Sequence, residues 1–250
     1  MEKRNTILEV AVFTPGSALT AAKAGADRIE LCSGFSEGGL SPSAGTIQHV
    51  REKLQIPVHV MIRPRIGDFI YDAAEKEIIL KDIAFCKKLG IDGIVTGALN
   101  PSGKIDTDFM QKVIDAAGEM SVTFHRAFDL TSDLTESLET LIECGVSRVL
   151  TSGGKASVPD GLETIISLVS QAADRIIVLP GGGITTGNVK NIIHRSGVKE
   201  VHFSGKELVT SYMKPKEGVS LTSHNQVNDY EWFECDTEKI EALKAKLSGR

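Results

Sequence analysis

The chain has 250 residues, 41% of them hydrophobic, and a formal net charge of −5 at pH 7. This hydrophobic share is enough for a substantial core, and the acidic balance provides no basic field of the kind that favours nucleic acid. No apolar run approaches the roughly 20 residues that span a bilayer, and the N-terminus lacks a signal-peptide pattern. The composition therefore predicts a cytoplasmic protein that binds neither nucleic acid nor membranes.

Short β-rich runs alternate with helical segments along the chain, as is typical of parallel strands joined by crossover helices. The expected strands lie at 7–13, 28–33, 57–63, 93–99, 121–128, 148–154, 176–184 and 201–205. The expected helices between them lie at 15–24, 43–54, 72–89, 106–117, 134–144, 161–173 and 186–196. Eight such units predict a single (β/α)8 TIM-barrel domain over residues 1–250, and a doubly wound open sheet is the alternative.

The segment after the eighth expected strand breaks this pattern. Residues 206–236 are polar and irregular, and "DTEKIEALKAKL" (236–247) then predicts a terminal helix with Asp236 or Thr237 as its N-cap. A connection of this length is either functional or a solvent-exposed excursion. The sequence leaves both open.

Ionisable residues gather near the ends of the expected strands, where a TIM barrel has its active site. Glu30 lies on the second strand, Arg63 ends the third and Arg65 follows it, and "TFHRAFD" (123–129) supplies His125 and Asp129. Because side chains alternate along a strand, His125 is expected to point into the barrel. A structural ion-pair network inside the barrel is the alternative to a functional pocket.

A catalytic hypothesis follows from these residue types. Glu30 and His125 would act as acid and base, with Asp129 beside them, and histidine titrates near neutral pH. Arg63 and Arg65 would bind an anionic ligand, and Arg63 beside Glu30 would keep that carboxylate ionised.

Glycine-rich turns suggest where a phosphate would bind. "LPGGGIT" (179–185) places Gly181, Gly182 and Gly183 after the seventh strand, where backbone N–H groups approach an anion closely. Ser204 follows the eighth strand and Ser152 the sixth, so both are added to the expected phosphate site. A simple tight turn explains the glycines equally well.

The four cysteines are scattered singly, which argues against a disulfide framework. Cys86 and Cys144 lie in helical patterns and are expected to be small core residues. Cys32 and His202 are the candidate metal ligands, because thiolate with imidazole suits Cu(I) or Zn(II). No local ligand spacing supports a preformed metal site.

Several long segments resemble the copper homeostasis protein CutC family. They are "GADRIELCSGFSEGGLSPS" (25–43), "PVHVMIRPRIGDF" (57–69), "VTFHRAFD" (122–129), "RVLTSGG" (148–154), "LPGGGIT" (179–185) with Asn188, and "EVHFS" (200–204). The resemblance implies a (β/α)8 barrel, a cytoplasmic location, a homo-oligomer (dimer or larger) and copper handling with Cu(I) held by cysteines. One of the implicated cysteines matches Cys32, whereas Ala11 stands at the position of the other.

Two functions follow, and the sequence does not choose between them. The first is copper homeostasis with Cu(I) bound at Cys32, although Cu(I) prefers at least two soft ligands. The second is an enzyme acting on a small anionic metabolite, such as a phosphorylated one, at the C-terminal face of the barrel. A metabolite-binding protein without turnover is a third reading.

Overall fold

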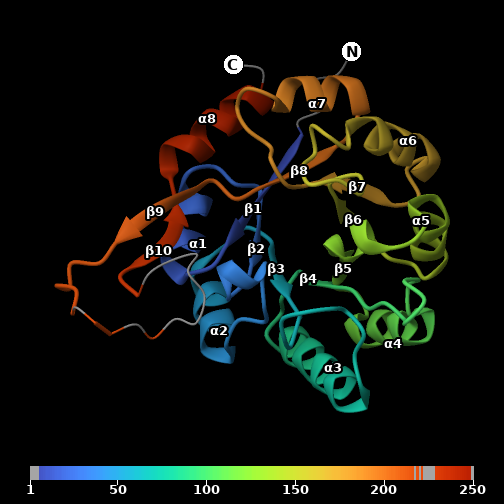
Figure 1. Cartoon of the computed structure of the whole chain (residues 1–250), viewed down its shortest axis with the longest axis horizontal. Coiled ribbons are helices and arrows are strands. Elements are labelled where there is room, and N and C mark those ends of the chain that lie inside the picture. The colour runs from blue at the N-terminus through green and yellow to red at the C-terminus, as the bar shows by residue number, and fades with distance from the viewer. Residues whose placement is uncertain (1–5, 217, 220, 222–228, 249–250) are drawn as a thin grey trace.

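A computed structural model describes residues 6–216, 218–219, 221 and 229–248. Eight parallel strands form one sheet in the order β7-β6-β5-β4-β3-β2-β1-β8, and a backbone bridge between Gly181 and His202 joins β7 to β8 (Figure 1). The sheet is therefore a barrel, as predicted, and not an open doubly wound sheet. The strands are β1 (Ile7–Val12), β2 (Arg28–Leu31), β3 (Val58–Met61), β4 (Gly93–Thr96), β5 (Ser121–Phe124), β6 (Arg148–Thr151), β7 (Ile177–Pro180) and β8 (Glu200–Phe203).

Helices surround the barrel, one after each strand (Figure 1). Most begin at a side chain that accepts a backbone N–H of the first turn, and Asp72 with Glu75 forms a full capping box. The helices are α1 (Pro15–Lys23), α2 (Ala44–Lys53), α3 (Ala73–Lys88), α4 (Thr107–Ala117), α5 (Leu134–Glu143), α6 (Leu162–Ala172), α7 (Val189–Ser196) and α8 (Thr237–Leu247).

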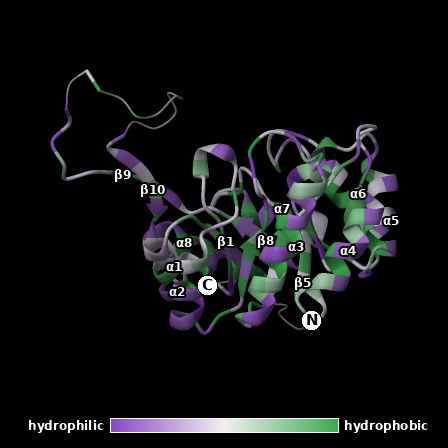
Figure 2. Cartoon of the chain, turned by 90° about the horizontal axis from the view of Figure 1, so that it is seen from below, coloured by the Kyte–Doolittle hydropathy of each residue, from purple (hydrophilic) through white to green (hydrophobic). Residues whose placement is uncertain are grey.

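The main hydrophobic core lies between the sheet and the helices. On β1, the buried Leu8, Val10 and Val12 belong to this core, whereas Glu9 and Ala11 alternate with them and face the lumen. In the hydropathy colouring of Figure 2, purple and green both occur on the strands at the centre, as this alternation requires, and purple residues are frequent on the outer helices. The alternation thus points apolar side chains outward from the barrel, toward the helices, and polar side chains into the lumen.

The fifth strand is shorter than expected, because the chain turns after Phe124. His125 becomes the N-cap of a 3-10 helix, η2 (Arg126–Leu130), and its ring accepts the N–H of Ala127. The predicted strand over 121–128 is therefore four residues long, and the turn changes the direction of Arg126. A second 3-10 helix, η1 (Phe35–Glu37), follows β2.

The long connection after β8 contains an antiparallel hairpin, which the sequence reading missed. Strands β9 (Lys206–Thr210) and β10 (Glu231–Cys235) pair along their whole length, and the hairpin projects from the barrel (Figure 2). Each strand has five residues in which apolar and polar side chains alternate only weakly, so the sequence pattern resembled an irregular loop. The helix after it starts as predicted, with Asp236 as N-cap.

Two further expectations concern the helices. No helix in the described part of the chain is both long and apolar enough to cross a membrane. Cys86 is buried, as predicted, whereas Cys144 at the end of α5 packs against the core but is only half-buried.

Candidate active site

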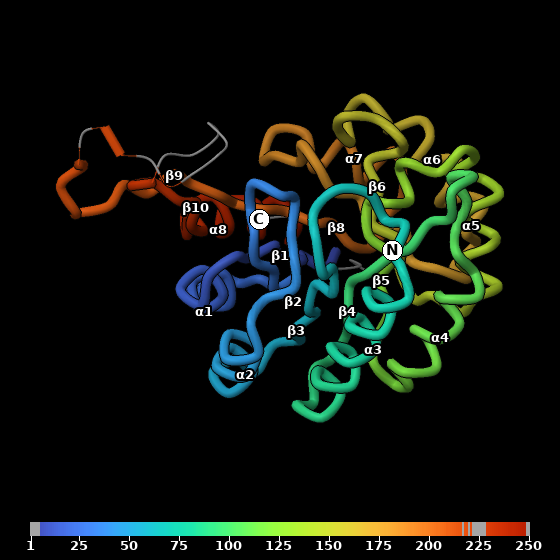
Figure 3. Tube along the Cα trace, turned by 60° about the horizontal axis from the view of Figure 1, so that its bottom comes forward, coloured from blue at the N-terminus to red at the C-terminus, as the bar shows by residue number. Residues whose placement is uncertain are grey.

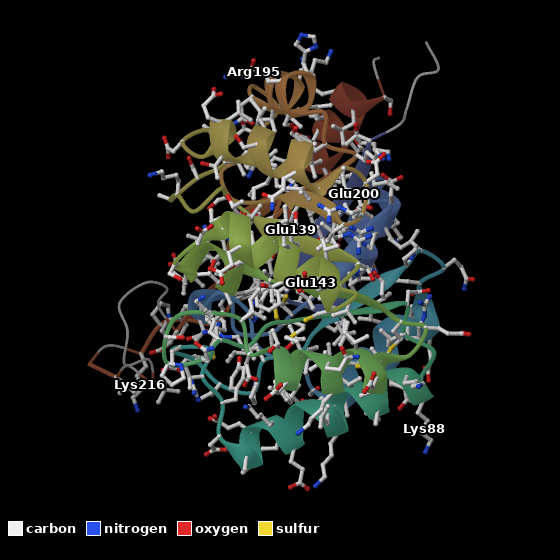
Figure 4. The ribbon with its side chains drawn as sticks, turned by 90° about the vertical axis from the view of Figure 1, so that its right-hand side faces the viewer. Lys88, Glu139, Glu143, Arg195, Glu200 and Lys216 are labelled. Atoms are coloured by element: carbon white, nitrogen blue, oxygen red, sulfur yellow. The ribbon has the colours of Figure 1, made fainter. Side chains whose placement is uncertain are left out.

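A chain of alternating charges fills the lower part of the lumen. Arg28 donates to Glu9 and to Glu200, each at 2.5 Å, and Arg148 donates to Glu200 at 2.7 and 3.1 Å. All four side chains are buried, and Figure 4 shows Glu200 within the body of the molecule, whereas Arg195 lies at its edge. Every charge in this network has a partner of opposite sign, as in a structural ion-pair network, but Arg28, Arg148 and Glu200 are not the strand-end residues for which the sequence left that alternative open.

His202 connects that network to the upper lumen. Its Nδ1 lies 2.8 Å from Oε1 of Glu9, and its Nε2 lies 3.8 Å from Oε2 of Glu30. Burial lowers the pKa of His202, but the carboxylates of Glu30 and Glu9 raise it more, so the net direction is upward. Burial likewise raises the pKa of Glu30. The two side chains therefore form a coupled pair that competes for a proton.

Cys32 lies beside this pair and is a poor thiolate. Its Sγ is 3.6 Å from Oε2 of Glu30, and the side chain is almost fully buried. Burial and then the Glu30 carboxylate raise the pKa of the Cys32 thiol well above its usual value. Among the described residues, the side chains close enough to share a metal ion are Glu9, Glu30 and His202, a group without Cys32.

His125 differs from the expected general base. Burial and then the charge of Arg63 lower the pKa of His125 to about 3, so the ring is neutral near pH 7. Because Nδ1 accepts the N–H of Ala127 at 3.3 Å, the proton of the neutral ring belongs on Nε2. That Nε2 is buried without a partner, so His125 can donate a hydrogen bond. The expectation of a pKa near 6.5 was wrong because it ignored burial.

Gly93 on β4 and Gly97 directly after it make room for the inward histidines. A Cβ at Gly97 would lie 2.7 Å from Nδ1 of His125, and one at Gly93 would lie 2.6 Å from the ring of His59. Any side chain at either position would displace a histidine. The two glycines in "DGIVTGAL" are therefore needed for the histidine rings to fit in the lumen.

Arg63 is held by carbonyl groups and not by Glu30. Its Nη1 donates to the carbonyls of Glu37 and Gly39, and its Nη2 donates to that of Gly67. The loops that carry these carbonyls follow β2 and β3 and run beside each other (Figure 3). No carboxylate of the described residues lies within 4 Å of the guanidinium, so the predicted Arg63–Glu30 pair was wrong. The Nε of Arg63 has no partner.

These side chains open into one cavity of about 510 Å³ at the C-terminal end of the barrel. Glu30, Arg63 and His125 all line it, so the sequence correctly brought these three together. Phe69 forms part of the wall, with its ring 4.6 Å from that of His125 and 4.9 Å from the Arg63 guanidinium carbon. The other predicted residues that line the cavity are Cys32, Gly182, Gly183, His202 and Ser204.

Four predicted site residues lie outside the cavity lining, and each has a structural partner instead. Arg65 binds Glu75 and Asp68 and is partly exposed. Asp129 accepts hydrogen bonds from the Thr151 hydroxyl and from the backbone N–H of Gly154, so it anchors the loop after β6. The hydroxyl of Ser152 contacts Asp129, and Gly181 forms the bridge that closes the barrel.

Sequence reasoning missed other residues of this region. Arg28, Arg148 and Glu200 each begin a strand, in "DRIEL", "SRVLT" and "KEVHF". Their common position at the first residue of a strand could have predicted that they meet, because parallel barrel strands place such residues in one layer of the lumen. Arg126 and Lys206 also line the cavity.

A model of the CutC family matches residues 6–207. The chain belongs to the CutC family. A CutC family protein of Xanthomonas campestris pv. campestris is 50% identical over 199 residues, covering 80% of this chain and 83% of that protein. The human copper homeostasis protein cutC homolog is 44% identical over 240 residues, covering 96% of this chain and 88% of the relative.

Solved structures agree with the barrel. A CutC structure from Streptococcus agalactiae has a TM-score of 0.76 and 32% identity, covering 80% of this chain and 98% of that one. Phosphoribosylanthranilate isomerase from Thermotoga maritima has a TM-score of 0.58 at 13% identity, with 98% of this chain covered, and this likeness concerns the fold alone. Membership of the CutC family thus accounts for the barrel and leaves the cavity chemistry to be argued from its residues.

Proposed function

We propose that the cavity of this CutC family member is an active site for a small anionic metabolite. The observation that carries this is a set of unsatisfied buried atoms: Nε of Arg63, Nε2 of His125 and Oε1 of Glu30 have no partner among the described residues. Buried polar atoms are normally hydrogen-bonded, because leaving one unpaired costs about 1–3 kcal/mol. All three belong to side chains that line the same cavity, and because the atoms themselves lie just behind its surface, a ligand would pair with them after a small movement of these side chains.

The chemistry of these atoms describes the ligand. Arg63 and neutral His125 offer N–H donors without a carboxylate partner, which suits an anionic oxygen. Glu30 and His202 lie at the floor, where they would exchange a proton with the bound molecule. Gly182 and Gly183, with positive φ angles of 107° and 77°, follow β7 and line the cavity wall across from Arg63. Because they have no side chain, their backbone is accessible to the ligand.

A thermal-shift screen tests this proposal with inorganic phosphate, sulfate and acetate as probes. A probe that binds the native state raises the melting temperature, and Arg63→Met and His125→Phe should each weaken binding by about tenfold or more. Arg195→Met makes the same change on the outer surface of the barrel and should bind as wild type does. The proposal fails if no anion binds the wild-type protein, or if both cavity variants bind as tightly as it does.

Copper binding is the second candidate, and one pair of side chains favours it. Cys32 and Met61 pack together in a small cluster that faces the cavity, so a thiol and a thioether, both soft donors, lie side by side. The raised pKa of Cys32 opposes thiolate formation, and Ala11 supplies no second thiol. We therefore expect this pair to hold Cu(I) more weakly than two thiolates would.

Anaerobic Cu(I) titration against a chromogenic chelator tests the copper candidate. Cys32→Ser should abolish a one-to-one site and Met61→Leu should weaken it, whereas Cys144→Ser, outside the cavity, should leave it intact. Equal stoichiometry and affinity in all four proteins would remove copper from this site. The cytoplasmic location and the homo-oligomer implied by the family resemblance stay predictions.

A further inference from the structure

Lys206 is a second cation at the cavity, and two aromatic rings hold it there. Its Nζ lies 4.5 Å from the ring centroid of Phe35 and 4.7 Å from that of Phe233. An ammonium group over aromatic faces is attracted by the negative charge density of the rings. The residue as a whole is exposed, so these two rings are what keep its ammonium at the cavity wall.

The base of the β9–β10 hairpin builds this arrangement. Lys206 lies opposite Cys235 in the hairpin, and Phe233 shares its face because side chains alternate along a strand. The N–H of Cys235 donates to the Ser17 hydroxyl at 2.8 Å, which ties β10 to α1. The N–H of Asp236 donates to the carbonyl of Gly205 at 2.8 Å. The long connection after β8 therefore returns to the barrel and adds a wall to the site.

The cavity lining contains more positively charged side chains than carboxylates. Among the described residues, no carboxylate lies within 4 Å of the charged groups of Arg63 or Lys206. Glu30 is the one acidic residue in the cavity lining, and it is coupled to His202. Arg126 also lines the cavity, but Asp129 pairs with it at 2.8 Å. In the described part of the chain, the charges of Arg63 and Lys206 thus remain without a carboxylate partner.

The two cations stand apart on the barrel rim. Arg63 follows β3 and Lys206 follows β8, and β1 and β2 lie between those strands, so the two residues leave the barrel three strand spacings apart, about 14 Å along the backbone wall. The same loop positions both, because Phe35 packs on Lys206 and the carbonyls of Glu37 and Gly39 hold Arg63. The two cations are therefore held at different points of this loop, an arrangement that suits a ligand with two anionic groups.

We propose that Lys206 is a second anion-recognition residue, so that the ligand carries two separate anionic groups. One group would bind at Arg63 and His125 and the other at Lys206. This inference rests on the proposed function of the cavity and specifies its substrate class. It also assigns a role in specificity to the hairpin, most of which lies beyond the residues that the CutC family model matches.

Binding of matched carboxylates tests the inference. The probes are linear dicarboxylates from malonate to suberate, each compared with the monocarboxylate of equal length, together with inorganic phosphate. In the wild-type protein at least one dicarboxylate should bind about tenfold or more tightly than its partner, because its second carboxylate gains a charge-assisted hydrogen bond to Lys206. Lys206→Met should remove this advantage and leave phosphate binding unchanged, because phosphate has its charge on one group.

Two further variants separate recognition from folding. Phe233→Leu keeps the lysine and removes one ring, so the dicarboxylate advantage should fall by about threefold. Lys214→Met removes an exposed lysine of the same connection and should retain the full advantage. Melting temperatures without ligand show whether each variant is folded.

The outcomes distinguish this inference from the proposed function. If phosphate binds in an Arg63-dependent way but no dicarboxylate has an advantage, or Lys206→Met keeps that advantage, the inference is overturned and the anion site survives. If no probe binds the wild-type protein, both are overturned. An advantage that disappears only in Lys206→Met and weakens in Phe233→Leu supports the inference.

Discussion

Replacing Arg28 by methionine should lower the free energy of unfolding by about 3–5 kcal/mol. Arg28 is buried and joins Glu9 to Glu200, each at 2.5 Å. Its removal leaves Glu200 with Arg148 alone and leaves Glu9 with only histidine partners. Removing one member of a buried ion pair is costly because the remaining charge has lost its solvation in water without keeping its partner.

Urea denaturation of wild type and variant measures this loss. Lys199→Met is the matched control, because Lys199 pairs with Asp174 on the surface, where an ion pair contributes about 0–1 kcal/mol. A loss in Arg28→Met no larger than in the control would show that the lumen is hydrated and that the network is not structural. The comparison therefore tests whether the buried charges around Arg28 stabilise the fold or are available for binding and catalysis.

The architecture was readable from the sequence because it depends on local patterns. Strand and helix periodicity, repeated eight times, leaves few alternatives, and the bounds of β3 and β7 fall inside the expected runs. Glu30, Arg63 and His125 line the cavity, as alternation along the expected strands predicted, although Arg63 and His125 lie just past the ends of β3 and β5. These inferences need only short stretches of chain and held in the structure.

Partnerships across the lumen were not readable, because they depend on distances between strands. The sequence paired Arg63 with Glu30, yet the Arg63 side chain bends toward the carbonyls of Glu37, Gly39 and Gly67. Glu30 instead faces His202, which comes from the far end of the chain. The hairpin was missed for a related reason, since β9 and β10 are stabilised by each other and by α1 more than by their own pattern.

Burial also changes what a residue can do chemically. Composition and position suggested a titrating His125, but a fully buried imidazole beside Arg63 resists protonation. The same effect turns Cys32 from an expected thiolate into a protonated thiol. Residue type therefore identified the site, and the environment of each residue determines its role.

The His125→Phe variant should lose less stability than wild type as the pH falls. The pKa of His125 is about 3 in the folded protein, against an ordinary value of about 6.5 in the unfolded chain. Between these values the unfolded state holds one more proton, so stability increases with pH in this window and is lost as the pH falls. Above it the ring is neutral in both states, and below it the ring is protonated in both.

One proton corresponds to about 1.4 kcal/mol per pH unit, so wild type should lose about 2–3 kcal/mol more than His125→Phe between about pH 6 and pH 4. His59, with its pKa lowered to about 4 by burial, adds a slope of the same sign, and Glu30, with a raised pKa, opposes it. Both are present in both proteins, so the difference between the two curves isolates His125. His194→Gln, which removes an exposed histidine of α7, is the control. Parallel curves for wild type and His125→Phe would mean that His125 is protonated in the folded state, and it would then bind an anion as a cation and not as a neutral donor.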